Sequence, residues 1–244
     1  MALGHAFLMR EFGIRPTIGW HIDPFGHSNT QATLFAAMGF SAFFFARIDY
    51  QDYATRNVSR TLEMVWRSSQ SLGGQSDLFT HVLYDTTYCY PRGFAFGYGD
   101  PPINDDERIE GYNIVQEADA FAALMRERRL NYRTSDVFVT FGCDFQYENA
   151  NINFKNMDKL MAYMNAHQAQ YNMTLFYSTP QTYVDTIHAK NLTWSLKTDD
   201  FFPYADRPHA YWTGYMTSRP ALKYYVRHAQ VCTHKIEILF YFKK

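Results

Sequence analysis

A continuous apolar run at residues 40–48 (FSAFFFARI) limits the folds open to this 244-residue chain, because such a run is typical of a strand buried on both faces of a parallel sheet. Ahead of it the sequence predicts a strand at residues 16–22, a turn at residues 23–27, and a helix that begins at Ser28 and ends at Gly39. Strand, loop, helix and strand in this order predict right-handed crossovers and an α/β fold with a parallel sheet.

The alternation is expected to continue along the chain. The apolar period predicts helices over residues 59–69, 115–129, 154–168 and 179–190, and short apolar runs predict strands over residues 78–83, 137–141 and 174–177. Residues 84–110 form a long stretch rich in Pro, Gly and Tyr, and loops of that length in compact domains are usually functional. Residues 236–242 are strand-like but fall outside the alternation.

Charge and hydropathy exclude two classes of partner. The chain has 23 Lys and Arg against 24 Asp and Glu, so it lacks the basic surface of a nucleic-acid-binding protein. No stretch approaches the roughly 18 uncharged apolar residues of a spanning helix, so no membrane span is expected. Residues 1–11 lack a basic leader and a small-residue cleavage site, so they are expected to be part of the fold.

Cysteine usage and glycosylation motifs say little about the compartment. Cys89, Cys143 and Cys232 are odd in number and lack C-x-x-C spacing, which argues against a disulfide framework and a cysteine zinc site and favours free or buried thiols. Three N-x-S/T motifs, at Asn57, Asn172 and Asn191, lean only weakly toward the secretory route.

Two carboxylates follow predicted strands. Asp23 comes directly after the strand at residues 16–22, and Asp144 follows the strand at residues 137–141 after a Gly-Cys step. Ligands of parallel α/β folds bind beyond the carboxyl ends of the strands. A pair of acids among aromatic side chains is typical of a glycosidase, in which one carboxylate attacks and the other donates a proton. The alternative is that these carboxylates only cap helices.

The same turn is open to a metal-binding interpretation. By the strand period, His21 and Asp23 share one face, and His27 lies four residues beyond Asp23, so zinc or another divalent ion could use these side chains. A single histidine near a strand end is more often structural.

Longer motifs give a resemblance. The segment at residues 19–28 (GWHIDPFGHS) resembles the nucleophile segment of the class II α-mannosidases, glycoside hydrolase family 38, and is most similar to the lysosomal branch. Further segments resemble the family in the same order: residues 39–40, 43–45 and 47–50, residues 142–151 (GCDFQYENAN), residues 202–207 (FPYADR) and residues 211–220 (YWTGYMTSRP). Together they cover roughly residues 5 to 230.

The resemblance implies roles for individual residues. Asp23 would be the nucleophile and a ligand of zinc, and Asp144 would be the acid/base of a retaining reaction, with the two carboxyls roughly 5 to 5.5 Å apart. Phe25, Arg47 and Tyr88 match residues around the bound mannose. Arg47 is physically apt, because a guanidinium favours the ionised form of a nearby carboxylate.

Other features of the resemblance concern the metal. His21 is not implied as a ligand, and His27 is implied to be structural. Family members carry a His-x-Asp strand upstream and a His-His-Asp segment downstream that supply further zinc ligands, and neither lies in these 244 residues. Asp23 is then the one expected ligand present, so we expect the isolated chain to have little or no activity and not to retain zinc.

The resemblance thus implies an incomplete, seven-stranded parallel β/α barrel-like catalytic domain at residues 1–230, without its first strand, and a divergent tail at residues 231–244. The expected function is a zinc-dependent retaining α-mannosidase that acts on terminal mannose of N-glycans in a lysosome or another secretory or vacuolar compartment. Its partner would be a mannose-containing oligosaccharide. The alternatives are a carbohydrate-binding paralogue that is catalytically inert, or a truncated gene product.

Overall fold

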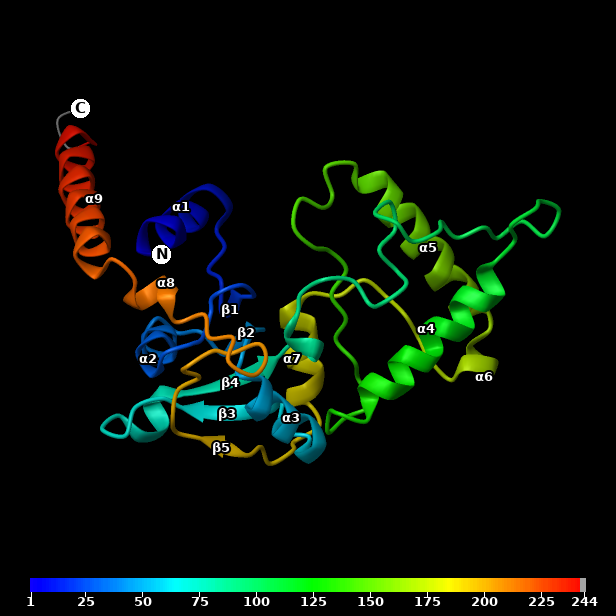
Figure 1. Cartoon of the computed structure of the whole chain (residues 1–244), viewed down its shortest axis with the longest axis horizontal. Coiled ribbons are helices and arrows are strands. Elements are labelled where there is room, and N and C mark those ends of the chain that lie inside the picture. The colour runs from blue at the N-terminus through cyan, green and yellow to red at the C-terminus, as the bar shows by residue number, and fades with distance from the viewer. Residues whose placement is uncertain (242–244) are drawn as a thin grey trace.

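A sheet of five strands organises one half of the molecule. The computed structural model describes the backbone of residues 1–241 and the side chains of residues 1–232. The strands are β1 (Ile18–His21), β2 (Ala42–Phe45), β3 (Glu63–Arg67), β4 (Asp77–Val82) and β5 (Leu196–Lys197), in the order β1-β2-β4-β3-β5 (Figure 1). Three of the four strand pairings are parallel, and β3 runs antiparallel to β4. The predicted α/β class and mostly parallel sheet are confirmed.

The predicted N-terminal unit is also confirmed. After β1, the Ser28 side chain caps helix α2 (Asn29–Ala37) and accepts a hydrogen bond of 3.1 Å from the backbone N–H of Gln31. All four residues of β2 are buried. The helix packs so closely on β1 that a Cβ atom added to Gly19 would lie 2.7 Å from the ring of Phe35.

The prediction of a helix at residues 59–69 is wrong. Helix α3 (Tyr50–Ser59) ends there: Asp49 caps its first turn, and Arg60 ends it with a left-handed φ of 56°. The chain then enters β3, where Met64 and Trp66 are buried on one face by the strand period of two. The apolar spacing of this short segment fits both periods, and tertiary packing decides for the strand.

Two predicted strands are not strands in the structure. The side chains of residues 137–141 point to alternate sides of the backbone. Phe138 packs with the cluster around Phe44, while Val139 and Phe141 pack with the cluster around α4. Both neighbours of β4 in the sheet are already taken, by β2 and β3, which leaves this segment without a ladder partner there.

At residues 174–177, a side chain replaces the strand partner. The Asn165 amide both accepts from the backbone N–H of Leu175 and donates to its carbonyl, each at 2.8 Å. These are the backbone groups that a neighbouring strand would otherwise satisfy.

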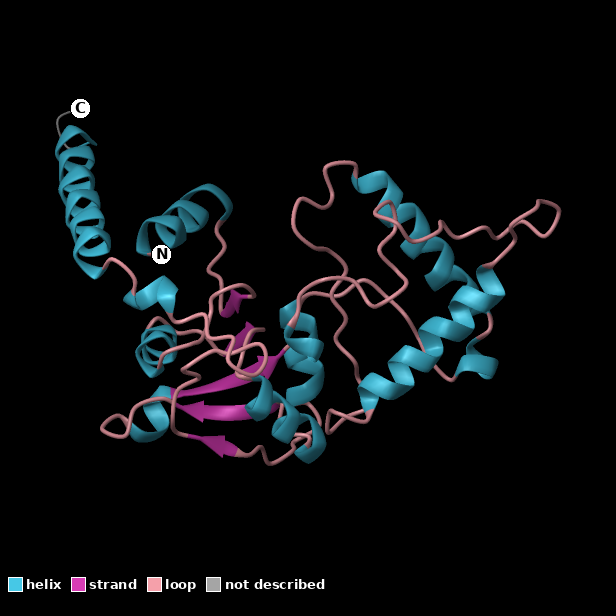
Figure 2. Ribbon diagram, viewed as in Figure 1, coloured by secondary structure: helices cyan, strands magenta, loops and turns pink. Residues whose placement is uncertain are grey.

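Helices and the long loop build the other half of the molecule (Figure 2). Helix α4 (Ile114–Arg129) packs against α5 (Ala150–Ala166), and the loop at residues 84–110 adds buried apolar side chains to their core: Phe94, Phe96 and Ile103. The remaining helical elements are α1 (Ala2–Phe12), α6 (Gln168–Tyr171), α7 (Pro180–His188), α8 (Gly214–Thr217), α9 (Pro220–Tyr241) and the 3₁₀ turns η1 (Gly73–Ser76) and η2 (Tyr84–Thr86). The predicted helices at residues 115–129, 154–168 and 179–190 are confirmed to within a few residues.

The prediction of a strand at residues 236–242 is wrong for the described residues, because helix α9 continues through Tyr241. Phe242 lies outside the described residues. Within residues 1–241, the helices are too short or too polar to cross a membrane.

The cysteine prediction is wrong for two of the three residues. Cys89 and Cys143 form a disulfide with a Cα–Cα distance of 4.4 Å, and Cys232 is free and exposed. The partners are 54 residues apart in sequence, at the start of the long loop and in the turn before α5. The three cysteines are therefore one disulfide-bonded pair and one free thiol, which the odd number of cysteines does not exclude.

Candidate active site

Asp23 and Arg47 meet at one edge of the sheet. Asp23 lies two residues after β1 and Arg47 lies two residues after β2, and these neighbouring strands are parallel, so both side chains emerge at the same end. Arg47 Nε donates to Asp23 Oδ1 at 2.5 Å. The Asp23 side chain is 52% exposed, so its carboxylate is open to a ligand while it is held by the guanidinium.

Aromatic rings surround the Arg47 guanidinium. Its Cζ lies 5.4 Å from the ring centroid of Phe25, 5.8 Å from that of Tyr88 and 5.9 Å from that of Trp212. These are cation–π distances. Partial burial acts to lower the pKa of Arg47, but Tyr204 and Asp23 outweigh it and leave that pKa above its ordinary value. Arg47 is a permanent cation here.

The backbone of Arg47 is also unusual, with a φ of 44° in the left-handed region. A residue with a side chain adopts this conformation only when its surroundings hold it there, and such residues concentrate at functional sites. The ion pair with Asp23 and the ring contacts provide that hold.

Tyr88 holds Asp144. The Tyr88 hydroxyl donates to Asp144 Oδ1 at 2.6 Å. This hydrogen bond, together with burial and the charge of Asp23, raises the pKa of Tyr88, so that the phenol keeps its proton and remains a donor. Each partner is next to one half of the disulfide, Cys89 after Tyr88 and Cys143 before Asp144. The disulfide therefore ties together the two segments that carry this hydrogen bond.

The structure brings together the predicted site residues. A path of contacts runs from Asp23 through Arg47 and Tyr88 to Asp144, and Phe25 lies beside Arg47. These residues come from four separate segments of the sequence.

His27 and His21 do not face Asp23 as a metal site would require. His27 is buried, its Nε2 donates to the Ala46 carbonyl at 3.0 Å, and burial lowers its pKa to about 4. The His21 ring packs edge-on against Phe35 at 5.2 Å, and burial lowers its pKa as well. Both histidines have packing or backbone partners that account for their positions.

Further aromatic residues complete the site. Trp212 and Tyr215 lie 4.7 and 4.4 Å from the Phe25 ring centroid, and Tyr204 stacks on Phe25 at 6.3 Å. The two motifs that hold these residues belong to the family resemblance, but the sequence predicts no role for the individual residues. Their signal was the density of aromatic residues in those motifs.

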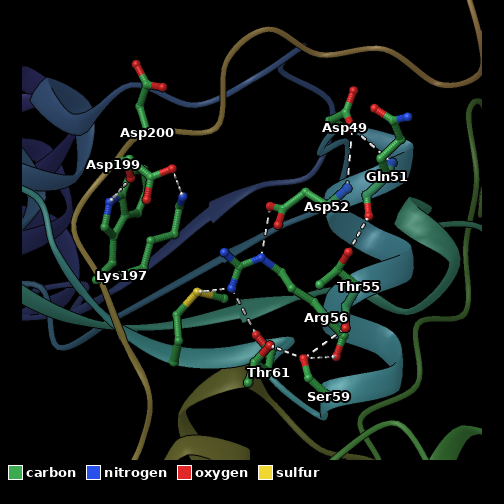
Figure 3. Close-up of polar contacts among 12 residues, drawn as sticks. Asp49, Gln51, Asp52, Thr55, Arg56, Ser59, Thr61, Lys197, Asp199 and Asp200 are labelled. Carbon is green, nitrogen blue, oxygen red and sulfur yellow. Dashed lines mark hydrogen bonds and ion pairs between the residues drawn. The ribbon is translucent and has the colours of Figure 1, made fainter.

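Contacts behind the site fix the segment that carries Tyr204. Phe201 exchanges backbone hydrogen bonds with His27 and is flanked by two cations, Arg56 at 5.3 Å and Lys197 at 4.3 Å from its ring centroid. Figure 3 shows both cations in ion pairs, Arg56 with Asp52 and Lys197 with Asp199. The N···O distances of these pairs are 2.9 and 2.8 Å. They hold the segment in place.

The donors around Asp23 do not make a zinc site by themselves. Zinc takes about four nitrogen, sulfur or oxygen ligands. Among the side chains that the structure describes, no group of three or more His, Cys, Asp or Glu residues is placed to share a metal ion. At this site Asp23 is bonded to Arg47, and both nearby histidines face elsewhere.

Comparison with known proteins identifies the family of the chain. Residues 1–207 match the model of the glycosyl hydrolases family 38 N-terminal domain. The chain belongs to glycosyl hydrolase family 38. Family 38 relatives include the lysosomal alpha-mannosidase of Dictyostelium discoideum, 48% identical over 97% of this chain, and that of Homo sapiens, 49% identical over 93% of it. The chain spans 23% of the length of each of these relatives.

A solved structure supports the fold. The crystal structure of an alpha-mannosidase from Enterococcus faecalis V583 superimposes with a TM-score of 0.55 at 15% identity, over 80% of this chain and 19% of that one. The match of residues 1–207 to the family model and the identity to the two relatives confirm the resemblance to family 38 that the motifs indicate.

Proposed function

We propose that this chain carries the nucleophile, Asp23, and the acid/base, Asp144, of a retaining α-mannosidase. The observation that carries the proposal is the path of contacts that links these carboxylates through Arg47 and Tyr88. In a retaining glycosidase one carboxylate attacks the anomeric carbon while the other protonates the leaving oxygen.

In the first step, an Asp23 oxygen bonds to the anomeric carbon of mannose as the bond to the leaving oxygen breaks. The proton of Asp144 goes to that oxygen. In the second step, Asp144 takes a proton from water, the water oxygen bonds to the same carbon, and Asp23 is released. Arg47 holds Asp23 in position for attack, and Tyr88 orients Asp144 through its 2.6 Å hydrogen bond.

Phe25, Arg47 and Tyr88 would border the mannose. Phe25 is part of an aromatic cluster with Trp212 and Tyr215, which offers ring faces to the apolar side of a sugar. The formal net charge of −1 is close to zero and fits an uncharged glycan. The similar relatives are named lysosomal alpha-mannosidases, and we extend their lysosomal placement and an N-glycan substrate to this chain as part of the proposal.

Zinc receives no step in this mechanism. The family resemblance implies that Asp23 would also contact zinc, but the described side chains offer no further ligand beside it. This observation favours a second candidate function, a carbohydrate-binding protein that holds mannose without turning it over. The two candidates share the site around Asp23 and Asp144 and differ in whether the bound sugar is hydrolysed.

The test measures binding and turnover on the same chain. Methyl α-mannoside binding is followed by saturation-transfer NMR, and hydrolysis of an aryl α-mannoside is followed at high protein concentration, with and without added zinc. Both candidates predict binding, which Arg47→Ala should weaken. The enzyme also predicts turnover, slow without a complete metal site, that Asp23→Asn and Asp144→Asn abolish.

A loop variant, Asp106→Asn, serves as the control for these substitutions, because among the described residues the Asp106 side chain bonds to Arg108, two positions along the chain, and to no catalytic residue. Binding without turnover would favour the carbohydrate-binding protein. The absence of both binding and turnover would contradict both candidate functions.

A further inference from the structure

A disulfide lies directly behind the acid/base. Cys89 follows Tyr88 and Cys143 precedes Asp144, so the S–S bond joins the chain neighbours of two hydrogen-bonded residues. The Cα atoms of the cysteines are 4.4 Å apart, and the Tyr88 hydroxyl lies 2.6 Å from Asp144 Oδ1. One covalent link and one polar link therefore connect the same two segments.

Both segments are irregular. Residues 87–95 and residues 130–149, all of them described, form no helix or strand, so no ladder of backbone hydrogen bonds holds either segment. Phe145 and Tyr147, just after the acid/base, have φ values of 59° and 67°. Residues with side chains adopt this left-handed conformation when their surroundings hold them there. The position of Asp144 therefore depends on contacts with the long loop.

Several of those contacts are hydrogen bonds near the surface. The Tyr90 hydroxyl lies 2.6 Å from Gln146 Oε1, and the Tyr98 hydroxyl donates to the Phe145 carbonyl at 3.2 Å. A single hydrogen bond contributes little net stability, because water competes for both of its partners. The disulfide is a link that water cannot replace.

The disulfide is accessible to small molecules. Cys89 and Cys143 are half-buried, and both line a hollow of about 420 Å³. A thiolate reduces a disulfide by attack on one of its sulfur atoms, so the rate depends on access to that sulfur. This bond is therefore open to a small dithiol, unlike a bond enclosed in the core.

We propose that the Cys89–Cys143 disulfide positions the acid/base, and that its reduction by a dithiol releases the Asp144 segment from Tyr88 and weakens proton donation to the leaving group. The inference rests on the proposed function, since it takes Asp144 as the acid/base. The two cysteines are positioning residues, because they act through Asp144.

The reduction proceeds by thiol–disulfide exchange. One thiolate of the dithiol bonds to a cysteine sulfur, and the other cysteine leaves as a thiolate. The second thiol of the reductant then bonds to the reductant's own first sulfur and releases the remaining cysteine. Two electrons and two protons pass from the dithiol to the protein, which gains two thiols. A disulfide oxidant reverses the exchange.

The experiment compares two aryl α-mannosides whose leaving groups differ in their need for a proton. The Cys232→Ser chain, which lacks the free thiol, is assayed at high concentration before and after reduction with dithiothreitol, at a temperature where circular dichroism shows it folded. The kcat/KM for phenyl α-mannoside is expected to fall about tenfold on reduction. The kcat/KM for dinitrophenyl α-mannoside should change less than about twofold, because its acidic leaving group departs without a proton. Reoxidation should restore the first value.

Tyr88→Phe tests whether the disulfide acts through the hydrogen bond. With that bond removed, reduction should no longer change the ratio of the two kcat/KM values. A second readout needs no turnover. The ¹³C NMR signal of the Tyr88 ring carbon that bears the hydroxyl should move on reduction, while that of Tyr224, an exposed tyrosine on α9, should not.

Three results separate the possible failures. Complete reduction that leaves both kcat/KM values unchanged would overturn the proposal. An equal fall for both substrates would also overturn it, because the disulfide would then support the fold or the nucleophile. If the oxidised chain hydrolyses neither substrate, the enzymatic function fails instead, and a Tyr88 signal that does not move on reduction would overturn the positioning role separately.

Discussion

Removal of the Cys89–Cys143 disulfide by the double substitution Cys89→Ser/Cys143→Ser is expected to destabilise the chain strongly. The bond closes a loop of 54 residues, and the chain-entropy relation for such a loop gives about 4 kcal/mol at 25 °C. The loop contains α4 and the stretch at residues 84–110, so the cross-link restricts a large part of the unfolded chain. The native state would also lose the link behind the Tyr88–Asp144 hydrogen bond.

Urea unfolding without reductant measures this change as a loss in the free energy of unfolding extrapolated to water, with a lower midpoint and a steeper slope in the double variant because its denatured chain is less compact. Reduction of the wild-type chain should lower its midpoint to that of the double variant. Cys232→Ser is the matched control, because Cys232 is free and exposed and its loss should leave the midpoint unchanged. Three free thiols in the denatured, unreduced wild-type chain would refute the reasoning, as would a loss of stability below about 1 kcal/mol in the double variant.

Three further predictions concern titration and modification. Burial lowers the pKa of His27 from 6.5 to about 4, so as the pH falls the unfolded chain takes up the proton before the folded chain does. The free energy of unfolding should therefore fall by about 3 kcal/mol between pH 6.5 and pH 4. Urea midpoints measured across this range should decline less in His27→Gln than in the wild-type chain. Burial and the carboxylate of Glu63 raise the pKa of Tyr183 well above 10, so stability should be retained below pH 10 and fall as the pH rises further, with a shallower fall in Tyr183→Phe. On expression through a secretory route, mass spectrometry should find glycans at the exposed Asn172 and Asn191 but little at Asn57, whose side-chain oxygen is buried.

Sequence patterns predicted the elements whose signals are local. The strand, Ser28 cap and helix of the first unit depend on residues adjacent in sequence, and they form as expected. Helix α3 was missed because its end is marked by Arg60 in a left-handed conformation, where glycine is the usual signal. The apolar spacing of the following segment then predicts a helix, whereas its buried side chains follow a strand period.

Long-range pairing was not accessible from sequence. Whether residues 137–141 join the sheet depends on which strands flank β4, and the antiparallel β3 occupies one of those places. The pairing of Cys89 with Cys143 likewise depends on how the long loop returns to the turn before α5.

The candidate site was predicted residue by residue from the motif resemblance. The structure adds its connections, in which Arg47 bonds to Asp23 and Tyr88 bonds to Asp144. These contacts join segments that are up to 56 residues apart in sequence, so no local pattern reports them.

The most direct test of the central claim is to trap the bond between the sugar and the nucleophile. In Asp144→Asn, α-mannosyl fluoride needs no proton for departure of its leaving group, while hydrolysis of the covalent intermediate lacks its base and should be slow. Peptide mass spectrometry is predicted to find mannose attached to Asp23 in this variant and to find none in the Asp23→Asn/Asp144→Asn double variant. A mannosyl adduct on another residue, or no adduct at all, would contradict the assignment of Asp23 as nucleophile and Asp144 as its partner.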